Sequence, residues 1–203
     1  DLNLDGTVYS TDGATTFTAV STGTIDLGGS SPTFTTSADT ITFGTANVKV
    51  ADGTLTVNSV GGLIDFEGSI LGTSDEVLVL NANAATDGAS TNEKVIVAAI
   101  GTGDQIHSVS ITGRDGITLE GNITTSNKAS NNVSFTGPVS INAATVAIDT
   151  DATGNDGTVT FSSTIDSASG TSRNLDIVSA TGNVTVTGAI GATTALASLD
   201  INQ

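Results

Sequence analysis

The sequence predicts an all-β protein, and within that class a parallel β-solenoid whose coils contain about 20–25 residues each. Three observations lead to this prediction. Short runs of alternating apolar and polar residues are bounded by Gly, Asn and Asp, which is typical of strands joined by turns. The apolar spacing of an amphipathic helix is not sustained across two turns. A seven-residue pattern recurs along the chain, as expected when similar coils stack on one another.

The recurring pattern is apolar-x-apolar-x-(Gly/Ser)-x-apolar, and it occurs without gaps at 64–70, 117–123, 133–139, 159–165 and 184–190. Related runs begin at 41 and 95, so the starts at 41, 64, 95, 117, 133, 159 and 184 are separated by 23, 31, 22, 16, 26 and 25 residues. The apolar positions are predicted to form the ladder of the core: Ile64, Phe66, Ile70, Ile117, Leu119, Ile123, Val133, Phe135, Val139, Val159, Phe161, Ile165, Val184, Val186 and Ile190.

A second element follows the first, because Ile165 and Ile190 are followed nine or ten residues later by the triplets 175–177 and 199–201, both Leu-Asp-Ile. The unit is therefore a strand, a turn, a short strand and a turn. One coil cannot bury its inward side chains alone, so coils should stack about 4.8 Å apart in parallel. We expect one elongated domain over 1–203, less regular at 1–40 and clearer at 41–203.

A pair of tandem Ig-like β-sandwiches is the alternative fold. Segment 100–111 aligns without gaps on 190–201, and this separation of 90 residues is close to the length of one such domain. The solenoid is preferred because the shorter pattern also recurs inside that interval.

The composition limits which residue types can fill the core and which classes of partner the chain can bind. The chain has 21 acidic and 5 basic residues, a net charge of −16, and no Cys. Nucleic acid is therefore not an expected partner, because phosphate binding needs clustered Lys and Arg. No run approaches the roughly 20 apolar residues that cross a bilayer, so membrane insertion is not expected. The apolar residues are mainly small or β-branched, which predicts a core of Val, Ile, Leu and Ala rather than of large aromatics.

Calcium is the one cofactor that the residues point to. Asp1, Asn3, Asp5 and Asp12 stand at the oxygen-donor positions of a calcium loop, with Gly6 between them. Against a calcium loop, no helix precedes this segment, and the last ligand is Asp rather than the usual Glu. Two interpretations stay open, a calcium site and an acidic first strand followed by a turn.

Catalytic residues are not predicted, and we do not expect an enzyme. His107 is the only His, and Arg114 and Arg173 stand apart from each other and from the scattered lysines. Carbohydrate-cleaving enzymes on such scaffolds normally combine acidic residues with clustered Lys or Arg.

The repeats between residues 157 and 201 resemble those of a known family of proteins. The segments 157–161, 175–177, 181–191 and 199–201 resemble the repeats of large bacterial exoproteins of the filamentous-haemagglutinin and autotransporter-adhesin type. The resemblance covers about residues 40–203. It implies an exported protein that folds as a right-handed parallel β-helix and acts in attachment, matrix formation or cell-surface scaffolding. It supplies no catalytic residues.

These observations predict an extracellular structural or adhesive protein of the bacterial cell surface, either a filament subunit or a segment of an adhesin stalk. The last strand-like segment, 197–203, is not followed by a cap, and open ladder edges invite further strands. We therefore expect self-association, as a homopolymer or as the continuation of a longer solenoid, and also a glycan or cell-surface receptor as partner. A calcium- or carbohydrate-binding β module is the alternative function, and an enzyme on the same scaffold is a third.

Overall fold

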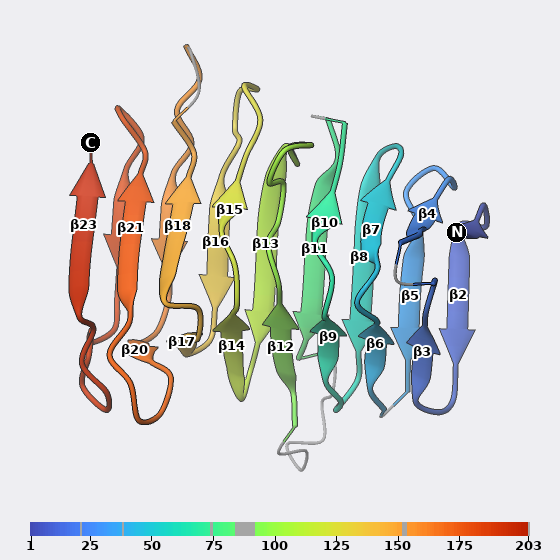
Figure 1. Cartoon of the computed structure of the whole chain (residues 1–203), viewed down its shortest axis with the longest axis horizontal. Helices are drawn as coiled ribbons and strands as arrows, with labels where there is room; N and C mark the ends of the chain where they lie inside the picture. Colours follow the sequence, from blue (N-terminus) through green and yellow to red (C-terminus); the bar gives the residue numbers. More distant parts are fainter. Residues whose placement is uncertain (21, 38, 74, 84–91, 152–153, 203) are drawn as a thin grey trace.

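A computed structural model describes residues 1–20, 22–37, 39–73, 75–83, 92–151 and 154–202. The chain forms an all-β parallel solenoid of about 8 turns, with about 24 residues per coil. Figure 1 shows the coils side by side along the long axis, from the first coil at one end to the last coil at the other. The predicted fold class is confirmed. Tandem Ig-like sandwiches are excluded, because their strands pair antiparallel whereas the strand pairs described here are parallel.

Each coil has three sides, and each side contributes strands to one of three sheets, which we call A, B and C. Sheet A is a pair of four-stranded ladders joined through isolated bridges at Ile100. It contains β1 (Leu2–Leu4), β4 (Thr24–Leu27), β7 (Asn47–Val50), β10 (Ile70–Leu71), β15 (Ile123–Thr124), β18 (Thr145–Asp149), β21 (Asn174–Val178) and β23 (Ser198–Asn202).

Sheet B has eight strands and sheet C has seven. Sheet B contains β2 (Val8–Thr11), β5 (Thr33–Thr36), β8 (Thr54–Ser59), β11 (Val77–Ala82), β13 (Ser108–Gly113), β16 (Val133–Thr136), β19 (Val159–Phe161) and β22 (Val184–Val186). Sheet C contains β3 (Thr15–Phe17), β6 (Ile41–Phe43), β9 (Ile64–Phe66), β12 (Lys94–Val97), β14 (Gly116–Leu119), β17 (Val139–Ile141) and β20 (Ile165–Ser167). Within the described ranges, no helix is long and apolar enough to cross a membrane.

Alternation along each strand builds the core. Successive side chains of a strand point to opposite faces, so the apolar residues of β14 and β17 point inward while Thr118 and Ser140 point outward. The register then stacks apolar side chains of adjacent coils on one another, because Ile117 pairs with Val139 and Leu119 pairs with Ile141. The inward side chains therefore form continuous apolar columns parallel to the long axis, and most of them are fully buried.

Aromatic rings dominate the core of the first three coils, which the composition did not predict. Phe43 lies between Phe17 and Phe66, with ring centroids 5.1 Å and 4.4 Å away. Tyr9 stacks on Phe34 at 4.6 Å in sheet B, and the Phe34 ring meets the Phe43 ring edge to face. A few large rings can thus fill a narrow core because the register stacks each ring on the ring of the next coil.

The seven-residue pattern describes a corner of the coil, and its five ungapped copies occupy two different corners. The copies at 64–70 and 117–123 lead from sheet C to sheet A, whereas the copies at 133–139, 159–165 and 184–190 lead from sheet B to sheet C. The irregular spacing of 16 residues between the starts at 117 and 133 follows from this change. In sheet C, Ile117 pairs with Val139, which lies 22 residues later.

The glycine of the pattern is required by close packing between successive corners. A Cβ atom at Gly68 would lie 2.2 Å from the carbonyl oxygen of Ala46 in the preceding coil. At Gly137 it would lie 2.0 Å from the carbonyl oxygen of Gly113, and there φ is also +125°. A side chain at either position would push the coils apart.

Burial of the predicted ladder residues depends on their coil. Twelve of them, from Ile64 to Ile165, are buried, with at most 2% of their surface exposed. In the last coil Val184 and Val186 are partly buried and Ile190 is 39% exposed. Phe66 belongs to sheet C, whereas Phe135 and Phe161 stack on each other in sheet B. Their shared position in the pattern therefore does not place them in one column.

Replacing Phe43 with Ala should lower the free energy of unfolding by about 3–5 kcal/mol, because it empties a ring-sized volume between Phe17 and Phe66. The matched control is Thr42→Ala, whose side chain points outward from the same strand and should cost about 1 kcal/mol or less. Urea unfolding followed by circular dichroism measures both. Equal losses in the two variants would show that the ring column does not stabilise the first coils.

Candidate functional site

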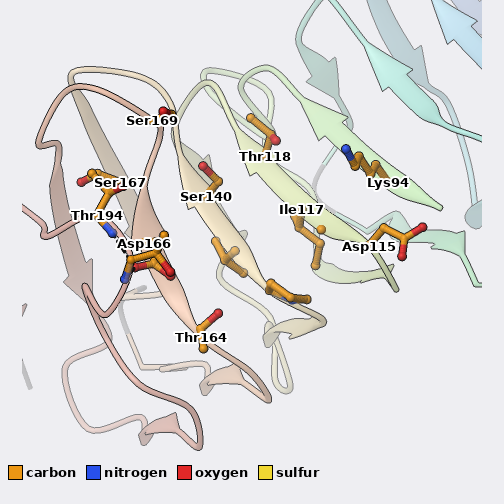
Figure 2. A pocket seen from close by; sticks show the side chains of 14 residues that line it. Lys94, Asp115, Ile117, Thr118, Ser140, Thr164, Asp166, Ser167, Ser169 and Thr194 are labelled. Atoms are coloured by element: carbon orange, nitrogen blue, oxygen red, sulfur yellow. Dashed lines mark hydrogen bonds between the residues drawn. The ribbon is translucent and has the colours of Figure 1, made fainter. Parts of the chain in front are cut away.

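The outer face of sheet C carries a groove with a volume of about 370 Å³. It crosses β12, β14, β17 and β20, and Figure 2 shows the side chains that line it. The lining residues are Lys94, Asp115, Gly116, Ile117, Thr118, Pro138, Val139, Ser140, Thr164, Asp166, Ser167, Ser169, Thr193 and Thr194. This volume is within the range of small-molecule sites in proteins.

Strand register forms the floor of the groove. Thr118, Ser140 and Asp166 are paired in succession, so these three side chains form one outward row across three coils. Beside this row lie Gly116 and Pro138, and Gly116 has no side chain to fill the space above it. The depression therefore results from small residues at outward positions of a regular sheet.

A backbone loop fixes the carboxylate at one end of the groove. Asp166 Oδ1 accepts hydrogen bonds from the backbone N–H groups of Thr193, at 2.7 Å, and Thr194, at 3.1 Å. The same loop is bonded to β20, because Ser167 Oγ donates to the carbonyl oxygen of Ala195 at 2.9 Å. Asp166 is thus held rigidly, with one oxygen committed to the loop.

Asp115 lies toward the opposite end of the groove from Asp166 (Figure 2). The backbone also holds its carboxylate. Its Oδ2 atom accepts a hydrogen bond from the backbone N–H of Glu93 at 2.9 Å. Lys94, next in sequence, is the single basic residue among those that line the groove. One oxygen of each carboxylate is therefore bound to the backbone, and the other accepts no hydrogen bond within the described part of the chain.

The hydroxyl groups of the groove are available to a ligand. The described residues provide no hydrogen-bond partner for the side-chain hydroxyls of Thr118, Ser140 and Thr164, although all three line the groove. The site thus presents oxygen acceptors at both ends and groups that both donate and accept between them. Such a surface suits a ligand that is rich in hydroxyl groups.

The electrostatic surroundings of the groove are negative. Asp65, on the neighbouring strand β9, has its pKa raised by burial, by the charge of Glu67 and by the charge of Glu120. Asp65 is paired with Ile96, and Ile96 with Thr118 of the groove floor, so this acidic cluster lies on the same outer face. Like charges therefore disfavour an anionic ligand on sheet C.

Sheet B differs from the other two faces. The eight strands of this sheet contain no charged residue, and their outward positions are mainly Thr, Ser and Asn. By contrast, sheet A presents Asp26 and Lys49 outward, and sheet C presents Asp65 and Asp166. The three sides of the solenoid thus have different surface chemistry over a common core.

The structure does not gather the residues of the predicted calcium loop. Asn3 lies in β1, whereas Asp12 follows β2 and accepts a hydrogen bond from the Ser37 hydroxyl. Asp1 Oδ1 accepts from the backbone N–H of Thr24 at 2.9 Å, and Asp5 lies against Gly28 of the second coil. The described residues form no group of three or more His, Cys, Asp or Glu side chains that could hold a metal ion. Calcium binding here stays a prediction from the sequence.

Sequence reasoning missed the groove. Its floor consists of the polar residues in the middle of apolar-polar-apolar triplets such as 117–119 and 139–141. These triplets are visible in the sequence, but the seven-residue pattern assigned Val139 to the end of one repeat rather than to the start of a sheet C strand. The correct coil-to-coil register would have aligned Thr118, Ser140 and Asp166.

Glu93, adjacent to the groove, is a buried carboxylate that forms an ion pair with a partly exposed arginine. Its side chain is fully buried, and its Oε2 atom lies 2.7 Å from Nη1 of Arg114, whose side chain is 36% exposed. Oε1 of Glu93 is buried without a hydrogen-bond partner among the described residues. The charge of Glu93 is thus compensated chiefly from one side, by Arg114.

Glu76 is a second buried carboxylate, and it organises the turn before β11. Its Oε2 atom accepts hydrogen bonds from the backbone N–H groups of Thr73, at 2.6 Å, and Asp75, at 3.2 Å, while Oε1 accepts from the Thr73 hydroxyl. Burial acts to raise the pKa of Glu76, but these hydrogen bonds outweigh it and hold the pKa below its ordinary value.

The chain is similar in sequence to outer membrane protein A of Rickettsia rickettsii, with 32% identity over 212 aligned residues. The alignment covers 98% of this chain but 8% of that protein, so the chain spans less than a tenth of the length of this relative. No protein-family model matches the chain. No solved structure matches it.

Replacing Arg114 with Ala should lower the free energy of unfolding by about 3 kcal/mol, because it leaves the Glu93 carboxylate buried without its partner. Lys128→Ala is the control, since it breaks the exposed ion pair with Asp75 and should change stability little. Chemical unfolding at neutral pH measures both. If the two variants are equally stable, water rather than Arg114 compensates Glu93.

Replacing Glu76 with Gln should destabilise the protein in a pH-dependent way. Because the folded-state pKa is lower than that of an unfolded glutamate, near 4.5, the carboxylate stabilises the fold above that pH and loses its effect as pH falls through the folded-state pKa. The difference in unfolding free energy between the wild type and Glu76→Gln should therefore shrink under acid conditions. A difference that stays constant with pH would contradict this role of the hydrogen bonds.

Proposed function

We propose that this chain is a rigid structural segment of an extracellular solenoid at the bacterial cell surface, where it serves as an adhesin stalk or as a filament subunit. The observation that carries the proposal is the continuous register of sheet B, whose eight strands pair in succession without a break. A solenoid with one unbroken core along its length acts as a spacer, because each coil contacts only its neighbours and the structure extends by adding coils.

The similarity to a much longer outer membrane protein supports this role. The alignment covers nearly the whole chain but only 8% of the relative, as expected for a stretch of repeats within a long extended protein. The net charge of −16 also supports it, because rods of like net charge repel one another in solution. A non-enzymatic role agrees with both observations.

The partner that we propose for the last described coil is another coil of the same kind. In the last described coil, side chains that point inward elsewhere are exposed, with Ile190 and Leu199 at 39% and Ile201 at 41%. These residues continue the buried columns of the earlier coils, and Ile201 pairs in register with Ile177. A further coil would bury them and would satisfy the open edge of β23. A second copy of the chain can supply that coil.

The isolated chain should therefore associate end to end. Its average mass in sedimentation experiments should rise with concentration, and small-angle scattering should show a maximum dimension that grows in steps of roughly 40 Å, the length of eight coils. Added salt should promote association, because it screens the repulsion between chains that each carry a charge of −16.

The variant Ile201→Asp should stay monomeric, because it places a charge in the proposed apolar junction. The matched control is Asp200→Asn, which alters the neighbouring outward residue of the same strand and should associate like the wild type. A wild-type chain that stays monomeric at all concentrations and ionic strengths would overturn self-association. If Asp200→Asn also stays monomeric, the contact between copies lies on the outer face of sheet A rather than at the apolar junction.

A further inference from the structure

We propose that the groove on sheet C binds a short, uncharged saccharide. This inference goes beyond the structural role, because a stalk needs no ligand on its sides. It rests on three features of the groove: two carboxylates held in place at its ends, a row of hydroxyl groups without partners along its floor, and a surrounding field that rejects anions.

The carboxylates are arranged before any ligand arrives. Asp166 Oδ1 is occupied by two backbone N–H groups and Asp115 Oδ2 by one, so neither side chain is free to rotate away from the groove. The second oxygen of each carboxylate can then accept a hydrogen bond from a ligand hydroxyl. Hydrogen bonds to an ionised acceptor are stronger than those between neutral groups, and a fixed acceptor loses little conformational entropy on binding.

The hydroxyl groups on the floor of the groove offer a row of weaker hydrogen bonds to a ligand. Thr118 and Ser140 are paired directly across adjacent coils, so their hydroxyl groups repeat at the coil spacing of about 4.8 Å along the solenoid axis. Each hydroxyl can both donate and accept. A saccharide that lies along the axis meets the hydroxyls of Thr118 and Ser140 and then the carboxylate of Asp166 at successive coils, while Asp115 flanks the row just before β14. A compact ion would use only one of these positions.

Charge selects a neutral ligand over an acidic one. Lys94 is the single basic residue among those that line the groove with Asp115 and Asp166, and the Asp65 cluster lies on the next strand of the same sheet. A carboxylated or sulfated sugar would therefore meet net repulsion. An apolar ligand is also disfavoured, because Thr118, Ser140 and Asp166 supply the outward row of the floor.

Affinity for one groove should be weak. The residues that line the groove include no aromatic side chain, so stacking against a sugar ring is not available. The groove is also open and modest in volume. A dissociation constant on the order of 1 mM is expected for a neutral disaccharide.

The test is a titration of the full chain with neutral disaccharides, namely cellobiose, lactose and N,N′-diacetylchitobiose, followed in two-dimensional amide NMR spectra. The acidic trisaccharide sialyllactose serves as the charged comparison. At least one neutral disaccharide should shift the amide signals of residues around the groove, such as Ser140 and Thr194, and sialyllactose should bind at least several-fold more weakly.

Two double variants make the test specific. Thr118→Val with Ser140→Ala removes the floor hydroxyls, which have no partners within the described structure, and should weaken binding about tenfold without changing the unfolding midpoint. Thr160→Val with Ser134→Ala makes the same changes at an outward, in-register pair on sheet B and should bind like the wild type. Asp166→Asn should also weaken binding, while its amide oxygen still accepts from the loop.

Three outcomes would overturn the proposal. One is the absence of amide shifts with all three neutral disaccharides at concentrations well above 1 mM. The second is an equal loss of binding in the sheet C and sheet B double variants. The third is tighter binding of sialyllactose than of lactose. Self-association of the chain is measured without sugar, so failure here would leave the structural proposal intact.

Discussion

The parallel hydrogen-bond ladder between successive coils is the constraint on which the rest of this structure depends. It fixes the register of each strand against the strand of the preceding coil, as where Val133, Ser134 and Phe135 face Val159, Thr160 and Phe161. A shift by one residue would turn the inward side chains outward. Because the register is kept on all three sides, the same ladder produces the apolar columns inside and the polar rows outside, including the floor of the sheet C groove.

The ladder also determines where charge can reside. Outward positions and corners hold most of the acidic side chains that the structure describes, because these positions face water. Glu76 and Glu93 are buried, and each is compensated locally, by donors in a turn or by Arg114. The outer surface is thereby free to differ from side to side, with an uncharged sheet B and an acidic, grooved sheet C built on one kind of core.

Alternation and repetition in the sequence were sufficient to predict a parallel solenoid, because both follow directly from strand geometry and coil stacking. The face to which each repeat belongs could not be predicted. Segment 100–111 aligns with 190–201, and Gly101 and Gly191 both have φ near +68°, yet Ile100 bridges sheet A and Ile190 bridges sheet C. The corners use similar local turns, so the pattern encodes the bend but not its place in the coil.

The groove and the aromatic columns escaped prediction for the same reason. Both depend on which residues lie one coil apart, and coil lengths vary with loops that carry little pattern. Phe17, Phe43 and Phe66 look isolated in the sequence and become neighbours only through the register of sheet C. The acidic residues at 1–12 are close in sequence but are not brought together by the fold. Their spacing resembles a calcium loop, whereas the first coil distributes them over separate segments.

The orientation of the ladder has a mechanical consequence. The strands lie across the long axis (Figure 1), so the backbone hydrogen bonds that join one coil to the next are aligned with that axis. Tension applied along the solenoid therefore loads these bonds at the terminal coil first, and the coils detach in sequence rather than together. Each detached coil releases about 24 residues, or roughly 80 Å of extended chain. A solenoid of this construction lengthens in steps under load while its remaining coils keep their shape.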